Sequence, residues 1–235
     1  MVLIDEALLQ VRSFGVCFYV LRDKEVLYLI DGGFLWGREA LEQSLREEGW
    51  NELPIIGILL THGHIDHILN VKRLADETGA WIAGAAEDEG FFAGELPYAG
   101  LGRLTGWAER VVGQAFGFER FSPDRFLVEG EKFDFWGGLE VIALPGHTGG
   151  HIGFYSVSRK LLFCGDVFAS FGCFSHLPPA IFNHDARENM ASIQRLKKLE
   201  LNGVLPNHCD RSLPAKHLSV LRKYFDRDSN KKSLS

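Results

Sequence analysis

The sequence has no block of basic residues and no long apolar run. With 25 Lys and Arg against 31 Asp and Glu the net charge is −6, so we expect no nucleic-acid partner, because such partners require a basic surface. Nothing approaches the roughly 18 apolar residues that span a bilayer, and residues 1–6 carry two acids where a secretory signal is basic, so we expect no membrane partner. The four cysteines lack CxxC spacing, which favours a reduced, cytoplasmic protein. They are Cys17, Cys164, Cys173 and Cys209.

Strands and helices alternate along the whole chain, which predicts an α/β protein. With 235 residues, 46% of them hydrophobic, one core suffices, and we expect a single domain over 1–235. Apolar runs predict two strands within 11–31, then strands at 55–60, 81–83, 132–135, 139–144, 151–157, 160–164 and 204–205. Helical spacing predicts four helices: one at 38–48, one that follows the cluster at 62–67 and runs to about 78, one after Asp185, and one from Pro214.

Residues at about 88–130 form an aromatic-rich insertion between these elements. Connections longer than about 12–15 residues tend to be functional or disordered, and this one is too apolar for disorder. We expect a partly helical excursion. It is either a lid over the functional site, a surface for a homodimer, or a packed insertion with its own small core.

The cluster His62-x-His64-x-Asp66-His67 directly follows the apolar run at 55–60. Ligand sites of α/β sheets lie in the turns after the strands. In such a turn His62 and His64 can face one metal ion while Asp66 and His67 face another. Imidazole nitrogen and carboxylate oxygen suit zinc, iron or manganese.

Three further ligand-type residues each end an apolar strand: His147, Asp166 and His208. Because strand ends can meet at one edge, we expect these side chains to gather there with the cluster. A metal site assembled from several turns is the prediction.

Asp31-Gly32-Gly33, the cluster, His147, Asp166 and His208 occur in an order that resembles the metallo-β-lactamase fold superfamily. The resemblance implies a four-layer αββα sandwich with metal ions at one edge. It implies ligand sets of His62, His64 and His147 for one ion and Asp66, His67 and His208 for the other, bridged by Asp166. It also implies that Asp31 orients the loop without being a ligand.

The same resemblance implies a dinuclear hydrolase that cleaves an ester, thioester or lactone by a metal-bound hydroxide. Its cofactors would be two divalent ions, with zinc as the first expectation and iron or manganese as alternatives. Asp66 would be catalytic, because it would orient the attacking water. No serine or cysteine nucleophile is required.

Segments 145–152 and 165–168 and the pair Gly172-Cys173 are similar to the glyoxalase II group. The likeness breaks at Phe174 and Ser175, where that group has a glycine and a basic residue that holds glutathione. Only 27 residues follow His208, fewer than the helical domain that completes a glutathione site. We therefore expect a small-molecule substrate with an apolar acyl part. The expected contacts are Phe168, Phe171, Phe174 and His176.

Two alternatives within this fold stay open. Persulfide dioxygenases resemble it and bind one iron through residues equivalent to His62, His147 and Asp166. A phosphodiesterase is the other, although the acidic balance argues against a nucleic-acid substrate.

Overall fold

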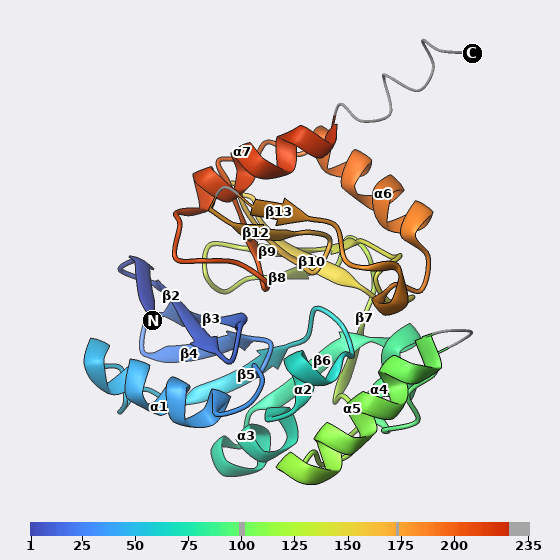
Figure 1. The fold of residues 1–235 in the computed structure, drawn as a ribbon. Coiled ribbons are helices and arrows are strands. Elements are labelled where there is room, and N and C mark those ends of the chain that lie inside the picture. Colours follow the sequence, from blue (N-terminus) through green and yellow to red (C-terminus); the bar gives the residue numbers. More distant parts are fainter. Residues whose placement is uncertain (99–101, 173, 226–235) are drawn as a thin grey trace, which may run out of the picture.

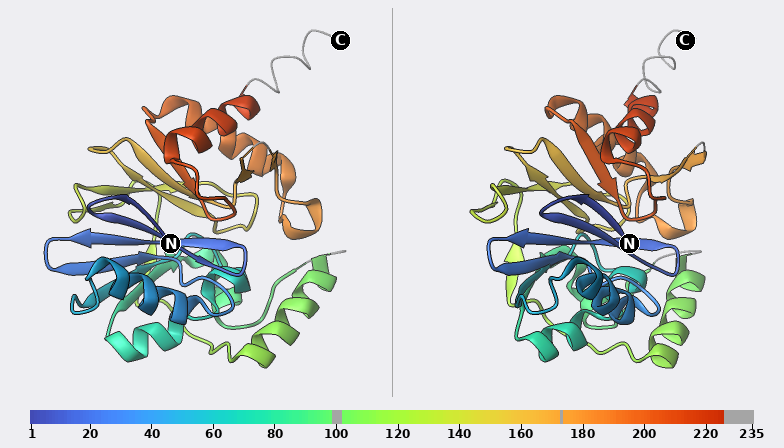
Figure 2. Two further views of the ribbon diagram at one scale, coloured as in Figure 1. Left: turned by 60° about the vertical axis from the view of Figure 1, so that its left-hand side comes forward. Right: turned by 90° about the vertical axis from the view of Figure 1, so that its left-hand side faces the viewer.

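Two sheets pack face to face with helices on both outer sides (Figures 1 and 2). The computed structural model describes residues 1–98, 102–172 and 174–225. Helix, sheet, sheet and helix form four layers, so the predicted αββα sandwich is confirmed. None of the helices in these ranges is long and apolar enough to cross a membrane.

The first sheet is mixed and follows chain order from β1 to β7. Its strands are β1 (Val2–Asp5), β2 (Leu8–Ser13), β3 (Val16–Asp23), β4 (Val26–Ile30), β5 (Ile55–Leu59), β6 (Trp81–Ala85) and β7 (Arg125–Leu127). Neighbours are antiparallel from β1 to β4 and parallel from β4 to β7. The parallel half places the ends of β4, β5 and β6 at the same edge.

The second sheet is also mixed, with the order β14-β11-β10-β9-β8. Its strands are β8 (Lys132–Phe133), β9 (Leu139–Ala143), β10 (Ile152–Ser156), β11 (Leu161–Gly165) and β14 (Gly203–Pro206). Only β11 and β14 are parallel neighbours within it. A separate hairpin joins β12 (Ala169–Phe171) to β13 (Phe174–His176).

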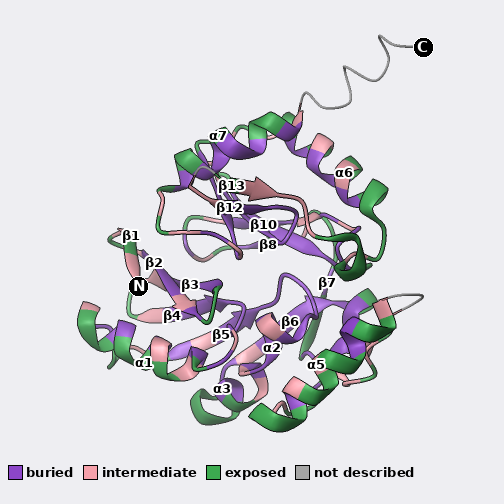
Figure 3. Ribbon diagram, in the orientation of Figure 1, coloured by how far each residue is buried: buried purple, intermediate pink, exposed green. Residues whose placement is uncertain are grey.

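Three apolar clusters lie between the four layers, as the burial colours show (Figure 3). The helices are α1 (Gly37–Glu48), α2 (Ile65–Ile68), α3 (Val71–Thr78), α4 (Glu89–Phe92), α5 (Gly102–Phe116), α6 (Ala186–Arg195) and α7 (Pro214–Phe225). One cluster joins the first sheet to α1 and α3, and another joins the second sheet to α6 and α7. The third lies between the sheets and contains Tyr19, Leu59, Phe154 and Phe163.

The ends of several helices follow directly from the sequence. Gly49 and Gly79 adopt left-handed φ angles of 70° and 74° after α1 and α3, a conformation that glycine reaches without a steric penalty. Asp185 accepts hydrogen bonds from the backbone N–H groups of Arg187 and Glu188 and so caps α6. The predicted ends of α1 and α3 and the predicted start of α6 are confirmed.

Other elements differ from the sequence prediction. The expected helix to about residue 78 is two helices, α2 and α3, separated near Asn70. The Asn70 side-chain amide donates to the carbonyl oxygens of Gly32, Gly33 and Phe34, so it fixes the loop after β4.

The sequence predicted two strands within 11–31, whereas the structure has two further strands, β1 and β2, before them. The chain turns at Phe14 and Gly15, both with positive φ, and β2 and β1 extend the sheet before that turn. The insertion at 88–130 contains the helices α4 and α5, as expected for a partly helical segment, and also the strand β7, which was not predicted. Its residues 99–101 lie outside the described residues.

Candidate metal centre

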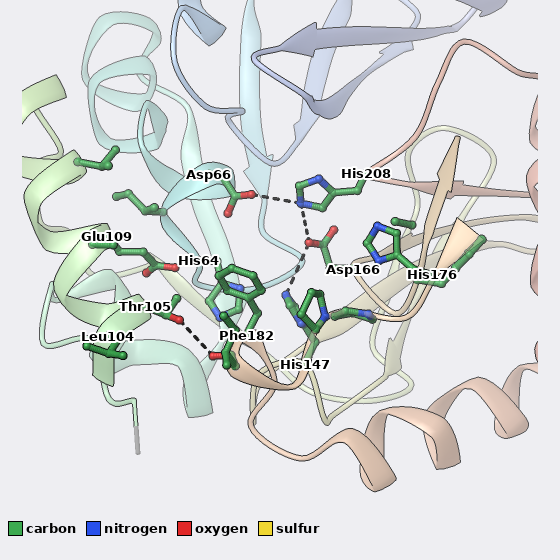
Figure 4. A pocket seen from close by; sticks show the side chains of 18 of the residues that line it. His64, Asp66, Leu104, Thr105, Glu109, His147, Asp166, His176, Phe182 and His208 are labelled. Atoms are coloured by element: carbon green, nitrogen blue, oxygen red, sulfur yellow. Dashed lines mark hydrogen bonds and ion pairs between the residues drawn. The ribbon is translucent and has the colours of Figure 1, made fainter. Parts of the chain in front are cut away.

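Seven ligand-type side chains from separate loops meet at one edge of the two sheets (Figure 4 labels five of them). The loop after β5 and the short α2 supply four, and the loops after β9, β11 and β14 supply one each. The ligand atoms of these side chains form three groups, and the atoms within each group all lie within 4.8 Å of one another. The groups are His62, His64 and His147; His62, His67 and Asp166; and Asp66, His67 and His208.

Asp166 lies between these groups. Its Oδ2 atom is 3.0 Å from His208 Nε2, 3.4 Å from His67 Nε2 and 3.6 Å from His147 Nε2. Asp66 Oδ2 is 3.2 Å from the same His208 nitrogen. One carboxylate therefore contacts residues of both predicted ligand sets, which is the geometry that a bridging ligand needs.

Several of these atoms are buried without a hydrogen-bond partner among the described residues. They are the Nε2 atoms of His62, His64, His67 and His147 and the Oδ1 atom of Asp166. Leaving a buried polar atom unpaired costs about 1–3 kcal/mol, so five at one place indicate a missing partner. Nitrogen and oxygen donors at this spacing fit divalent zinc, iron or manganese.

In two of these histidines the other ring nitrogen, Nδ1, contacts an oxygen of the protein. His67 Nδ1 lies 3.0 Å from Asp31 Oδ2 and His147 Nδ1 lies 2.9 Å from Asn183 Oδ1. A histidine whose Nδ1 is engaged in this way presents Nε2 to a metal. These contacts orient the rings before any ion binds.

Three of the histidines favour the neutral form that binds metal. Burial lowers the pKa of His62 and His64 well below the usual value, and the neighbouring imidazoles lower it further. Burial also lowers the pKa of His147.

The remaining pair is surrounded by carboxylates, which favour positive charge at this place. Burial opposes the charged form of His67, but Asp166 and Asp66 outweigh it and raise the pKa. Burial likewise opposes charge on His208, yet Asp166 raises the pKa to about 10. A site that stabilises imidazolium ions between two carboxylates is suited to a divalent cation.

Asp31 stands behind the cluster with no exposed surface. Its carboxylate accepts hydrogen bonds from the Thr61 N–H and hydroxyl groups at 2.8 Å each and from the Asn207 amide at 2.8 Å, and it contacts His67. It therefore ties the end of β4 to the loops after β5 and β14. It contacts a ligand-type residue without facing the groups of ligand atoms.

Asp88 has a similar role that the sequence reasoning missed. Its buried carboxylate accepts from the Gly63 N–H at 2.8 Å, the Thr148 hydroxyl at 2.7 Å and the Gly150 N–H at 2.9 Å. It joins the loop after β5 to the loop after β9. Its position just after β6, an acid at a strand end like Asp31, is the signal that could have identified it.

A cavity of about 580 Å³ opens beside the cluster and is mainly apolar (Figure 4). Phe168, Phe171 and His176 line it, as do Asp66, His64, His147, Asp166 and His208. Phe174 is exposed and does not line it, although its ring centroid lies 5.3 Å from that of His176. Cys173, part of the glyoxalase II-like segment, lies outside the described residues.

Other candidate side chains have structural partners. His151 Nε2 accepts from the backbone N–H of Asp166 at 3.0 Å.

Burial raises the pKa of Cys164, and contact with Cys17 together with burial raises that of Cys209. Both thiols therefore stay protonated, which makes them poor nucleophiles.

Sequence comparisons agree with this arrangement. Residues 12–208 match the profile of the Metallo-beta-lactamase superfamily. A hydroxyacylglutathione hydrolase, GloC, from Haemophilus influenzae is 33% identical over 191 residues, which are 79% of this chain and 80% of that protein. A hydroxyacylglutathione hydrolase from Cereibacter sphaeroides is 33% identical over 67% of this chain, which spans about half (48%) of that relative's length. The chain belongs to the metallo-beta-lactamase superfamily.

Solved structures show the same fold at lower identity. A metallo-beta-lactamase family protein from Thermus thermophilus superposes with a TM-score of 0.71 at 22% identity, over 95% of this chain and 79% of that one. The subclass B3 metallo-beta-lactamase BJP-1 of Bradyrhizobium japonicum gives 0.69 at 20% identity, over 99% and 94%. At these identities the likeness concerns the fold.

Proposed function

We propose that this protein is a metal-dependent hydrolase that cleaves an ester, thioester or lactone with an apolar acyl part. The observation that carries the proposal is the row of buried, unpartnered ligand atoms in the wall of an apolar cavity. The two sets of ligand atoms linked by Asp166 favour two divalent ions, with zinc the first expectation.

The proposed ligands are His62, His64 and His147 for one ion, Asp66, His67 and His208 for the other, and Asp166 between them. When bound, divalent ions lower the pKa of water from 15.7 to about 7 and polarise a carbonyl oxygen. No cysteine of the described residues lines the cavity, and the two thiols next to ligand-type residues, Cys164 and Cys209, are held protonated.

The protein's own residues would orient the reactants. The Asp66 side chain is 25% exposed and lines the cavity, so its carboxylate would orient the attacking water by a hydrogen bond. The acyl part would occupy the apolar space beside Phe168 and Phe171, where excluding water strengthens these polar interactions.

The substrate class within this reaction is also a proposal. The relatives named hydroxyacylglutathione hydrolase support a thioester, whereas Phe174 and Ser175 stand where the glyoxalase II group has a glycine and a basic residue that holds glutathione. A panel should therefore compare simple acyl thioesters with the corresponding glutathione thioesters.

The test is metal analysis of protein purified without added metal, followed by that panel with chromogenic esters and lactones. Hydrolysis that disappears on chelation and returns with zinc would support the proposal. Hydrolysis that survives complete metal removal would overturn it, as would one iron per chain with oxygen uptake on a persulfide. Cleavage of phosphodiesters alone would favour the phosphodiesterase alternative.

A further inference from the structure

Glu109 is a carboxylic side chain inside the apolar cavity that the proposed hydrolysis leaves unused. It projects from α5, within the aromatic-rich insertion, toward the His64 side of the cavity (Figure 4). Its Oε1 atom accepts a hydrogen bond of 2.5 Å from the Tyr98 hydroxyl. Its Oε2 atom is buried and makes no hydrogen bond to a described residue, although the backbone N–H of Ile65 is near enough to lower the pKa of the carboxyl group.

This oxygen is exceptional among the residues that line the cavity. The other buried and unpartnered side-chain atoms of the described lining belong to the ligand-type residues His64, His147 and Asp166. Thr105, the neighbouring polar side chain of α5, already donates to the carbonyl oxygen of Ile181 at 3.2 Å. An unpaired carboxyl oxygen in an apolar wall is costly, which indicates a partner that arrives with the ligand.

Tyr98 fixes this carboxyl group relative to the metal centre. The Tyr98 ring stacks on His64 with ring centroids 5.7 Å apart and an interplanar angle of 20°, while its hydroxyl holds Glu109. The free Glu109 oxygen therefore has a defined place beside the ligand-type residues. A group at a fixed position can select among substrates.

The chemistry of the carboxyl group restricts what it selects. Burial raises the pKa of Glu109 to about 8, and the nearby Asp66 carboxylate also raises it, so the group is a hydrogen-bond donor when protonated and an acceptor when ionised. A hydroxyl or an amide can pair with either form. A methylene can pair with neither.

We propose that Glu109 is a specificity-determining residue, which selects acyl chains that carry one uncharged hydrogen-bonding group, a hydroxyl or an amide, over purely aliphatic chains. This inference rests on the proposed hydrolase function. It adds to that proposal that the otherwise apolar acyl part of the substrate carries one polar group. Tyr98 acts as a positioning residue for the Glu109 carboxyl.

The experiment uses the metal-loaded full chain and octanoyl thioesters with a hydroxyl or an acetamido group at successive carbons. Thiol release gives kcat/KM for each, relative to the unsubstituted octanoyl thioester. We expect one position to be preferred about tenfold or more. Comparing the hydroxyl and acetamido series shows which of the two groups is selected.

Three variants decide the role of Glu109. Glu109→Leu should abolish the preference, Glu109→Gln should retain most of it because an amide still forms hydrogen bonds, and Gln114→Leu, an exposed position on the same helix, should match the wild type. Glu109→Leu removes an unpaired oxygen but also leaves the Tyr98 hydroxyl without its acceptor, so its Tm does not decide the role. The deciding readout is the ratio of kcat/KM between substituted and unsubstituted thioesters, because a purely structural loss would lower both equally.

A preference that persists in Glu109→Leu, or no preference at any carbon in a wild type that hydrolyses the parent thioester, would overturn this inference alone. If the wild type hydrolyses nothing, the proposed function fails. Calorimetric titration with the matching free acids then measures the same selectivity without turnover, and equal affinities in wild type and Glu109→Leu would overturn the inference.

Discussion

Asp31 Oδ2 lies 3.0 Å from His67 Nδ1, with both side chains fully buried. The same carboxylate accepts three further hydrogen bonds, two from Thr61 and one from Asn207. All of its neighbours are donors or are placed to donate. An acid that satisfies four donors from three residues, in α2 and in the loops after β5 and β14, fixes the shape of the metal centre.

Replacing Asp31 with asparagine should therefore destabilise the protein, because the new amide group would point two donors at other donors. We expect the free energy of unfolding to fall by about 2–4 kcal/mol and zinc affinity to fall about 10–100-fold. Asn tolerates the left-handed φ of 64° at this position, so backbone strain does not confuse the result. Urea unfolding and zinc titration measure the two effects.

The control is Asp76→Asn, at an exposed residue of α3 that pairs with Lys72. Exposed ion pairs contribute about 0–1 kcal/mol, so this variant should stay within about 1 kcal/mol of the wild type. An equal loss in the two variants would show that Asp31 has no special role.

Removal of metal should lower both Tm and activity. A ligand at 100 times its Kd stabilises the native state by about 2.7 kcal/mol, and here it would also satisfy buried imidazoles. We expect His62→Ala to lose bound zinc, since His62 belongs to two of the three groups. Elemental analysis and thermal unfolding with and without chelator check this.

His184→Ala serves as the matched control, because His184 is exposed and belongs to none of the three groups. Its zinc content should equal that of the wild type. Identical zinc content in His62→Ala would contradict the assignment of the site.

The stability of the metal-free protein should depend on pH through Glu109. Its pKa is raised to about 8 in the folded state and lies near 4.3 in the unfolded state. Between these values the native state binds more protons than the unfolded state, so this group makes stability fall as pH rises, by at most about 1.4 kcal/mol per pH unit. Below about pH 4 and above about pH 8 the contribution is constant.

Glu109→Gln lacks this titration. The free energy of unfolding of Glu109→Gln minus that of the wild type should therefore grow from about pH 4.5 to about pH 8 in urea titrations. Taking the difference cancels the other titrating groups, such as His67 and His208. A difference that stays flat over this range would show that Glu109 ionises normally.

Gly146 should tolerate no side chain. It has a φ of 127°, and a Cβ atom there would lie 2.0 Å from the backbone nitrogen of Asn189 in α6. We expect Gly146→Ala to cost about 3 kcal/mol and to weaken zinc binding, because the loop must move beside His147. Denaturant unfolding and zinc titration measure both.

Gly149→Ala is the comparison in the same loop. A Cβ atom at Gly149 would meet nothing within 4 Å, so the change should stay within about 0.5 kcal/mol. If both alanine variants behaved alike, the close approach to α6 would be unimportant.

The sequence was informative wherever local physics decides the structure. Apolar runs located β5, β9, β10 and β11, and Gly49, Gly79 and Asp185 marked helix ends. It was less informative for β7 and the β12–β13 hairpin, whose strands are three residues long. Such short strands carry too little periodicity to predict and are stabilised by their neighbours.

For the site, the sequence by itself determined which ligand-type residues follow the strands, because a polar residue after an apolar run is a local pattern. Tertiary structure alone decided that Asp88 joins two loops and that Tyr98 and Glu109 meet beside the cavity. It also decided that Phe174 is exposed and does not line the cavity. The Asp88 contacts join residues 25 and 60 positions apart, and Tyr98 and Glu109 are 11 positions apart. The packing of the layers, which no local pattern encodes, determines which of them meet.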